Sequence, residues 1–150
     1  MLILDDSKSL QVVLGGTVTN RLPVTVHWRD IATDGSTFVP DSDEVLTASD
    51  ATPTDVVAAA DADTRRVIDF LSIYNKDVAA VQVSVGPNNG TFYEMVVVTL
   101  GVGERLEYSN DHGFRVFTTG GAIKTADTDH VALGVGQMSY VTMGSDGTNN

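Results

Sequence analysis

Side chains that could act as nucleophiles, bases or metal ligands are spread along the 150-residue chain and form no known catalytic motif. The three histidines are His27, His112 and His130, and the Gly-x-Ser-x-Gly sequence that presents a serine nucleophile in many hydrolases is absent. The chain has no cysteine, which excludes disulfides, thiolate zinc sites and cysteine nucleophiles together. We therefore predict no catalytic residue and no enzymatic activity.

Acidic residues are the most numerous candidates for ligand binding, with 20 Asp and Glu side chains in the chain. Glu94 and Glu107 leave open a glycosidase pair, in which two carboxylates face each other across a cleft, although their spacing alone does not support it. Several short clusters could offer oxygen ligands to Ca²⁺, but none has the spacing of a calcium-binding loop. These clusters are Asp5-Asp6, Asp41 to Glu44, Asp61 to Asp63, and Asp127 to His130. We predict surface carboxylates and no metal site.

Glycine-rich and tyrosine-bearing segments provide the remaining candidates for a ligand site. Gly101-Val102-Gly103 and Gly134-Val135-Gly136 begin like dinucleotide-binding loops, but both lack the third glycine and the helix that should follow. We therefore predict no bound cofactor. A sugar-binding platform needs several exposed rings on one face, and its candidates here are Tyr74, Tyr93, Tyr108 and Tyr140.

Composition narrows the possible partners. There are 9 Lys and Arg against 20 Asp and Glu, a net charge of −11, so we expect no binding to nucleic acid, which requires basic side chains at the phosphates. No apolar stretch is long enough for a membrane helix, and Met1–Asp6 turns acidic too early for a signal peptide. We expect a soluble, unprocessed chain with no membrane partner, whose 42% apolar residues suffice for one packed domain.

Apolar residues mostly alternate with polar ones, the pattern of a strand with one buried face. This pattern covers 24–28, 81–85, 105–108 and 114–116, while Phe92–Leu100 is apolar on both faces. Glycine-rich turns at 86–90, 101–103 and 109–113 separate these runs, so we predict a four-stranded antiparallel meander over about 79–118. The strand at 66–74 should join it through another hairpin.

The N-terminal half adds strands at Leu10–Leu14 and Pro23–Ile31, followed by a turn-rich acidic crossing at 32–65. Within the crossing we expect only short strands, near Thr37–Val39 and Thr54–Ala58, and Thr54–Ala62 could instead form one or two helical turns. A long crossing between early and late strands is typical of Greek-key and jelly-roll topologies. The predicted fold is an all-β antiparallel sandwich of eight or nine strands with flexible N- and C-terminal arms.

The sequence suggests three parts. Residues 1–8 form an N-terminal arm, 9–124 the β-sandwich domain, and 125–150 a C-terminal extension with one strand at 131–143 and a polar tail. The apolar triplet Leu2-Ile3-Leu4 could tuck under a neighbouring subunit or close its own sandwich. Likewise, the strand in the extension could pair within its own subunit or reach a neighbour.

Several segments share a recognisable style of sequence, namely Leu10–Gly16, Leu22–Val26, Val67–Asp77, Val97–Tyr108, Gly113–Val116 and Gly121–Lys124. These segments resemble strands of small virion structural proteins of tailed bacteriophages. The similarity covers about 9–124 but not the acidic crossing at 40–65 or the segment after Lys124. The resemblance implies a capsid decoration (cement) protein that binds the outer capsid surface and stabilises the shell. A tail, baseplate or head-fibre adaptor is the alternative, and a carbohydrate-binding sandwich a lesser one.

A decoration role implies that the partners are the major capsid protein or other virion proteins. It also implies a location on the virion surface, with the host cytoplasm as the place of assembly, and we expect a homotrimer or homodimer. Apolar strand faces and termini should supply the contacts. The predicted interface residues are Leu2, Ile3, Leu4, Phe92, Tyr93, Met95, Val97, Val131, Leu133, Met138 and Tyr140.

Overall fold

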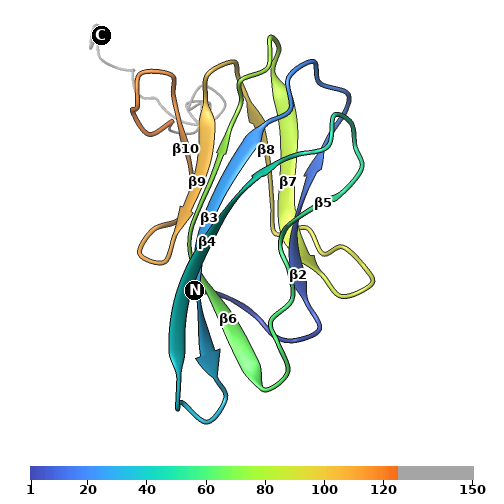
Figure 1. Cartoon of the computed structure of the whole chain (residues 1–150). Helices are drawn as coiled ribbons and strands as arrows, with labels where there is room; N and C mark the ends of the chain where they lie inside the picture. Colours follow the sequence, from blue (N-terminus) through green and yellow to red (C-terminus); the bar gives the residue numbers. More distant parts are fainter. Residues whose placement is uncertain (125–150) are drawn as a thin grey trace, which may run out of the picture.

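The structure is a computed structural model that describes residues 1–124. These residues form ten strands in two antiparallel sheets packed face to face, which confirms the predicted β-sandwich (Figure 1). The strands are β1 (Leu2–Leu4), β2 (Ser9–Leu14), β3 (Pro23–Ala32), β4 (Phe38–Leu46), β5 (Thr54–Val57), β6 (Thr64–Tyr74), β7 (Val81–Asn88), β8 (Val96–Leu100), β9 (Arg105–Ser109) and β10 (Gly113–Phe117).

One sheet has six strands and the other has four. The larger sheet runs in the order β10-β9-β6-β3-β4, with β1 also paired to β6, and the smaller runs β5-β2-β7-β8. Alternate residues of β2 and β3 are buried, as their sequence pattern predicts. Their apolar side chains meet those of β6 and β7 between the sheets, where residues such as Leu10, Val24 and Ile68 are completely buried.

The predicted meander is wrong, although all four of its strands exist. β7 and β8 form a hairpin in the smaller sheet, and β9 and β10 form another in the larger sheet. The turn after β8 therefore carries the chain from one sheet to the other. β6 likewise pairs with β3 and β9, and not with β7 as predicted. Short glycine turns fit both a hairpin and a tight crossing between layers, so turn length alone could not distinguish the two.

The acidic segment after residue 37 also differs from the prediction. β4 extends through Phe38–Leu46 along β3, where only a short strand near Thr37–Val39 was expected. Its side chains are nearly all exposed because β4 is an edge strand that reaches beyond the core. The backbone N–H groups of Ser42 and Glu44 donate to the carboxylates of Asp41 and Asp43, each at 2.8 Å. β5 excludes the helical alternative for Thr54–Ala62.

The first residues belong to the sandwich and do not form a separate arm at 1–8. β1 pairs with β6, with Leu2 opposite Ile68 and Leu4 opposite Arg66. Leu2 and Leu4 are buried in the core, and only Ile3 of the triplet is exposed. Of the two alternatives left open by the sequence, the triplet closes its own sandwich. The C-terminal extension at 125–150, including its predicted strand, lies outside the described residues.

Candidate functional site

The outer face of the six-stranded sheet gathers basic side chains from strands that are distant in sequence. Arg29 lies on β3, Arg65 on β6, Arg105 on β9 and Arg115 on β10. Each points outward because its neighbours in the strand, such as Trp28 and Leu106, face the core. We call this surface the arginine face. It is unusual in a chain of net charge −11.

Two of these arginines are neutralised by acids on the same face. The guanidinium of Arg29 lies 2.7 Å from a carboxylate oxygen of Asp69, and that of Arg105 lies 2.5 Å from Glu107. Among the described residues, Arg65 and Arg115 form no ion pair. Carboxylates lie near both side chains, since Asp5, Asp6 and Asp63 line a pocket with Arg65, and Glu107 is the strand partner of Arg115. The arginine face therefore presents two guanidinium groups outside ion pairs, which are available to bind a carboxylate of a partner.

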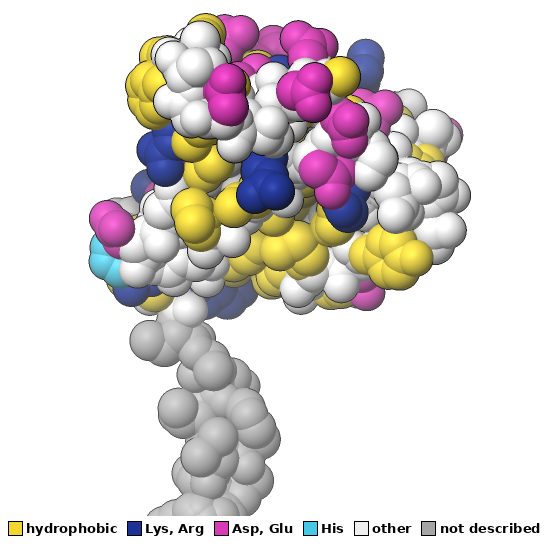
Figure 2. All heavy atoms as spheres, turned by 90° about the horizontal axis from the view of Figure 1, so that it is seen from below, with side chains coloured by type: hydrophobic (Ala, Val, Ile, Leu, Met, Phe, Trp, Pro, Cys, Tyr) yellow, Lys and Arg dark blue, Asp and Glu magenta, His cyan; other side chains and the backbone are white. Residues whose placement is uncertain are grey.

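Exposed apolar side chains border the arginines at the end of the sheet near the N-terminus. A shallow depression there is lined by Met1, Ile3 and Ile31 together with Arg29 and Arg65. Met1 is 78% exposed and Ile3 42% exposed. Figure 2 looks at the molecule from below and shows basic side chains lying among hydrophobic ones, with a group of acidic side chains beside them. Such a mixture of apolar and cationic side chains is typical of a protein-binding surface.

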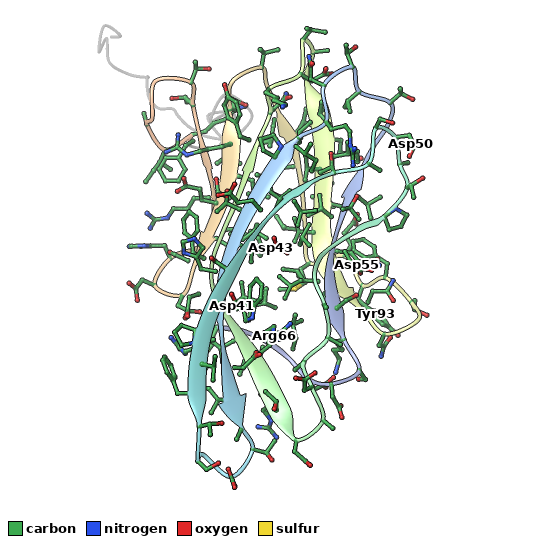
Figure 3. The ribbon with its side chains drawn as sticks, in the orientation of Figure 1. Asp41, Asp43, Asp50, Asp55, Arg66 and Tyr93 are labelled. Atoms are coloured by element: carbon green, nitrogen blue, oxygen red, sulfur yellow. The ribbon has the colours of Figure 1, made fainter. Side chains whose placement is uncertain are left out.

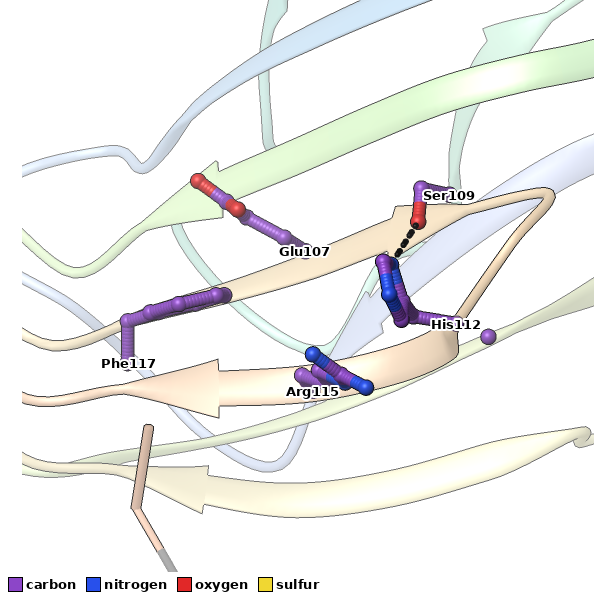
Figure 4. Close-up of a pocket in the computed structure, with 6 residues that line it drawn as sticks. Glu107, Ser109, His112, Arg115 and Phe117 are labelled. Atoms are coloured by element: carbon purple, nitrogen blue, oxygen red, sulfur yellow. Dashed lines mark hydrogen bonds between the residues drawn. The ribbon is translucent and has the colours of Figure 1, made fainter. Parts of the chain in front are cut away.

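The other end of the arginine face contains a small pocket with a serine and a histidine (Figure 4). Ser109 Oγ lies 3.5 Å from His112 Nδ1, at the limit of hydrogen bonding, and both side chains are open to solvent. The nearby carboxylate of Glu107 bonds to Arg105. A nucleophile–base pair needs a shorter bond and a third group that orients the base, so this geometry does not match a catalytic triad. The pocket instead continues the polar part of the arginine face.

The predicted interface residues occupy three different environments. Leu2 and Leu4 are core residues, so the prediction that they contact a partner is wrong for the described structure. Ile3 lies on the arginine face, as the register of β1 requires. Exposed residues from the other sheet form a second apolar group, in which Phe92 is half-buried and Tyr93, Met95 and Val97 are 57%, 48% and 43% exposed. Val131, Leu133, Met138 and Tyr140 lie outside the described residues.

The loop before β8 folds back on the smaller sheet and carries this second group. The backbone N–H groups of Tyr93 and Met95 donate to carbonyls of β7, and the Glu94 carboxylate accepts a 2.6 Å bond from the Ser84 hydroxyl. Gly86 permits this close approach, because a Cβ there would lie 1.9 Å from the Tyr93 carbonyl oxygen. Figure 3 shows Tyr93 on this loop, far from the acidic edge strand that carries Asp41 and Asp43.

The structure also separates the other candidate groups. Glu94 belongs to the loop beside the smaller sheet and Glu107 to β9 of the larger sheet, so they do not face each other across a cleft. Tyr74 and Tyr93 are exposed on different sheets, whereas Tyr108 is buried, and burial raises the pKa of its phenol. Within residues 1–124, no three His, Asp or Glu side chains are grouped in a way that could hold a metal ion.

The sequence analysis did not single out these arginines or their grouping. The alternation around Arg29 and Arg105 predicts that both side chains point away from the core. Their neighbourhood depends on β9 pairing with β6, which the sequence did not reveal.

No described helix is long and apolar enough to cross a membrane. Comparison with known proteins found no matching family model, no similar curated protein and no similar solved structure.

Proposed function

We propose that this chain is a non-enzymatic structural protein of a bacteriophage particle, and that it decorates the outer capsid surface by docking through its arginine face. The observation that carries the proposal is the combination of two arginines outside ion pairs, Arg65 and Arg115, with exposed apolar side chains on one sheet. The sequence resemblance to small virion proteins supplies the kind of particle. The major capsid protein is then the partner, and its contact surface should be acidic with an apolar centre.

The chemistry of the arginine face fits a stabilising role. Apolar contacts around Ile3 would supply much of the binding free energy, at roughly 25 cal/mol for each Å² of apolar surface removed from water. Arg65 and Arg115 would orient the protein and add charge-assisted hydrogen bonds to carboxylates. Many copies bound across the seams of a shell, as homodimers or homotrimers, would each add a small free energy to a large total.

The test uses purified shells from which the protein has been removed. Rebinding of the full chain should raise the melting temperature of the shells, and the double variant Arg65→Glu/Arg115→Glu should bind at least tenfold more weakly. The control Lys76→Glu, at an exposed site in the turn after β6, changes the net charge as much as either single variant, Arg65→Glu or Arg115→Glu, and should bind like the original chain. Binding by the arginine variants that equals that of Lys76→Glu would contradict docking through the arginine face.

Location on the particle is tested separately by electron microscopy of particles labelled with a specific antibody. Label on the head supports capsid decoration. Label only on the tail would replace that proposal with the adaptor role, and a glycan array that gives a reproducible hit would favour a carbohydrate-binding sandwich. Increasing salt should weaken binding to shells, because it screens exposed charges such as those of Arg65 and Arg115.

A further inference from the structure

One side of the sandwich covers its core less completely than the rest. The edge strands β8 and β10 lie on the same side, since β4 and β5 contact each other on the opposite side and β8 contacts β9. Four side chains here pack against the core but are only half-buried: Val96 and Val98 on β8, and Phe114 and Val116 on β10. We call this the β8–β10 side.

Among residues 1–124, no strand pairs with the outer edge of β8 on this side. The backbone carbonyl of Gln82 on β7 accepts a hydrogen bond from the N–H of Gly15, so the backbone groups of Gln82 point toward β2. Thr99 of β8 lies opposite Gln82, and its own backbone N–H and carbonyl therefore point away from β7, toward the open edge. Val97, two residues earlier, has the same orientation. The strand Val96–Leu100 contains no charged residue and no proline, the two devices that usually block an edge. By contrast, aspartate side chains occupy backbone donors of β4.

The chain leaves the described part of the structure beside this edge. Lys124 donates its backbone N–H to the carbonyl of Val116 on β10, at 2.7 Å, and its ammonium lies 3.0 Å from the carboxylate of Glu104 in the turn between β8 and β9. The next six residues, 125–130, can span up to about 20 Å, whereas stacked sheets are about 10 Å apart. Residue 131 can therefore reach the edge of β8.

The sequence that follows has the composition of a strand. Residues 131–143 contain no charged side chain, and Val131, Leu133 and Val135 alternate with small residues. We propose that residues 131–143 of the same chain add to the open edge of β8 and cover the half-buried side chains of the β8–β10 side. The tether through Lys124 favours the chain's own segment over that of a neighbour, because it gives a high local concentration. This inference does not depend on the arginine face.

The absence of cysteine allows a direct test in the full-length chain. Thr99→Cys is combined with a single cysteine at each position from 131 to 143, and the proteins are oxidised and separated on a non-reducing gel. We expect disulfides within one chain, strongest at alternate positions of the segment. The control places the fixed cysteine at Ser36, an exposed residue between β3 and β4. Disulfides only between two chains, or no more disulfide than in the control, would overturn the proposal.

Hydrogen exchange provides a second test that needs no cross-link. Leu133→Asp in the full chain should remove the cover, so the amides of Val97 and Thr99 should exchange at least tenfold faster than in the original chain. Thr148→Asp, which adds the same charge in the polar tail, should leave these rates unchanged. Equal exchange in the two variants would reject pairing at β8. Binding to shells by the Leu133→Asp variant would remain a separate measure of the arginine face.

Discussion

Substitution of Asn75 should reveal how the turns at one end of the sandwich are held together. Asn75 is completely buried after the end of β6, and its side-chain amide donates to the carbonyls of Ala79, Leu100 and Gly101 at 2.9, 2.9 and 3.1 Å. Its side-chain oxygen accepts the backbone N–H of Asp77 at 2.9 Å. One side chain thus joins two of the turns in which the chain changes sheets, those after β6 and after β8.

The expected loss follows from these contacts. The amide has two N–H hydrogens for its three acceptors, so Asn75→Ala removes the equivalent of three hydrogen bonds, at a net value of about 1 kcal/mol each. The carbonyl of Leu100 is buried with Asn75 as its side-chain donor, and leaving such a group unpaired adds about 1 kcal/mol or more. We expect the free energy of unfolding to fall by about 3 to 5 kcal/mol, a large part of a typical domain's stability.

Urea unfolding followed by the fluorescence of Trp28 provides the assay, because Trp28 is the one tryptophan of the chain and is buried. Asn89→Ala is the matched control. Asn89 is an exposed turn residue, and its replacement should change the free energy of unfolding by less than about 0.5 kcal/mol. A loss of less than about 1 kcal/mol for Asn75→Ala would refute the view that this amide holds the two crossings together.

Three further outcomes follow from particular contacts. Backbone N–H groups, led by that of Asn20, donate to the Asp77 carboxylate and hold its pKa below the ordinary value of 3.8. The ionised carboxylate therefore stabilises the fold above pH 3.8, and this stabilisation is lost as the pH falls through the lowered pKa of the folded protein. Asp77→Asn should therefore lower stability at pH 7 and flatten its decline in acid, and parallel acid titrations of stability in both proteins would contradict this. Gly86→Ala should cost about 2 kcal/mol or more in thermal unfolding, because its Cβ would meet the Tyr93 carbonyl, and an unchanged melting temperature would count against that clash. Asp41→Thr/Asp43→Thr should free the N–H groups of β4 and cause aggregation that light scattering detects, whereas a stable monomer would exclude protection by these acids.

The strands themselves were largely predictable from the sequence, because burial of one face imposes a two-residue period. The alternation at 24–28 and 105–108 identifies parts of β3 and β9. Their partners were not predictable in the same way, since pairing depends on contacts between distant segments. The side chain of Asn75, for example, donates to the carbonyl of Leu100, which lies 25 residues away in the chain. β4 was missed because its composition reflects an exposed edge and not a buried face.

The candidate site was less predictable than the fold. The sequence analysis chose apolar residues as interface candidates, and Leu2 and Leu4 were among them. Apolar side chains are also the ones buried in a protein core, and both residues are buried in their own sandwich. Arg65 and Arg115 have no distinctive sequence context, and they share a surface only because β10, β9, β6 and β3 are neighbours. The net charge of the chain does not reveal a local basic surface, because it is a sum over all faces of the molecule.

The protected edge of β4 limits the kinds of assembly that this protein can form. A sheet that is open at both ends can add copies end to end without limit, and the product is a filament. In the six-stranded sheet, β4 is one of the two ends, and Asp41 and Asp43 occupy its backbone donors. Strand addition at the β4 end of this sheet is therefore hindered. We expect copies that meet at high local concentration on a shell not to join end to end through this edge.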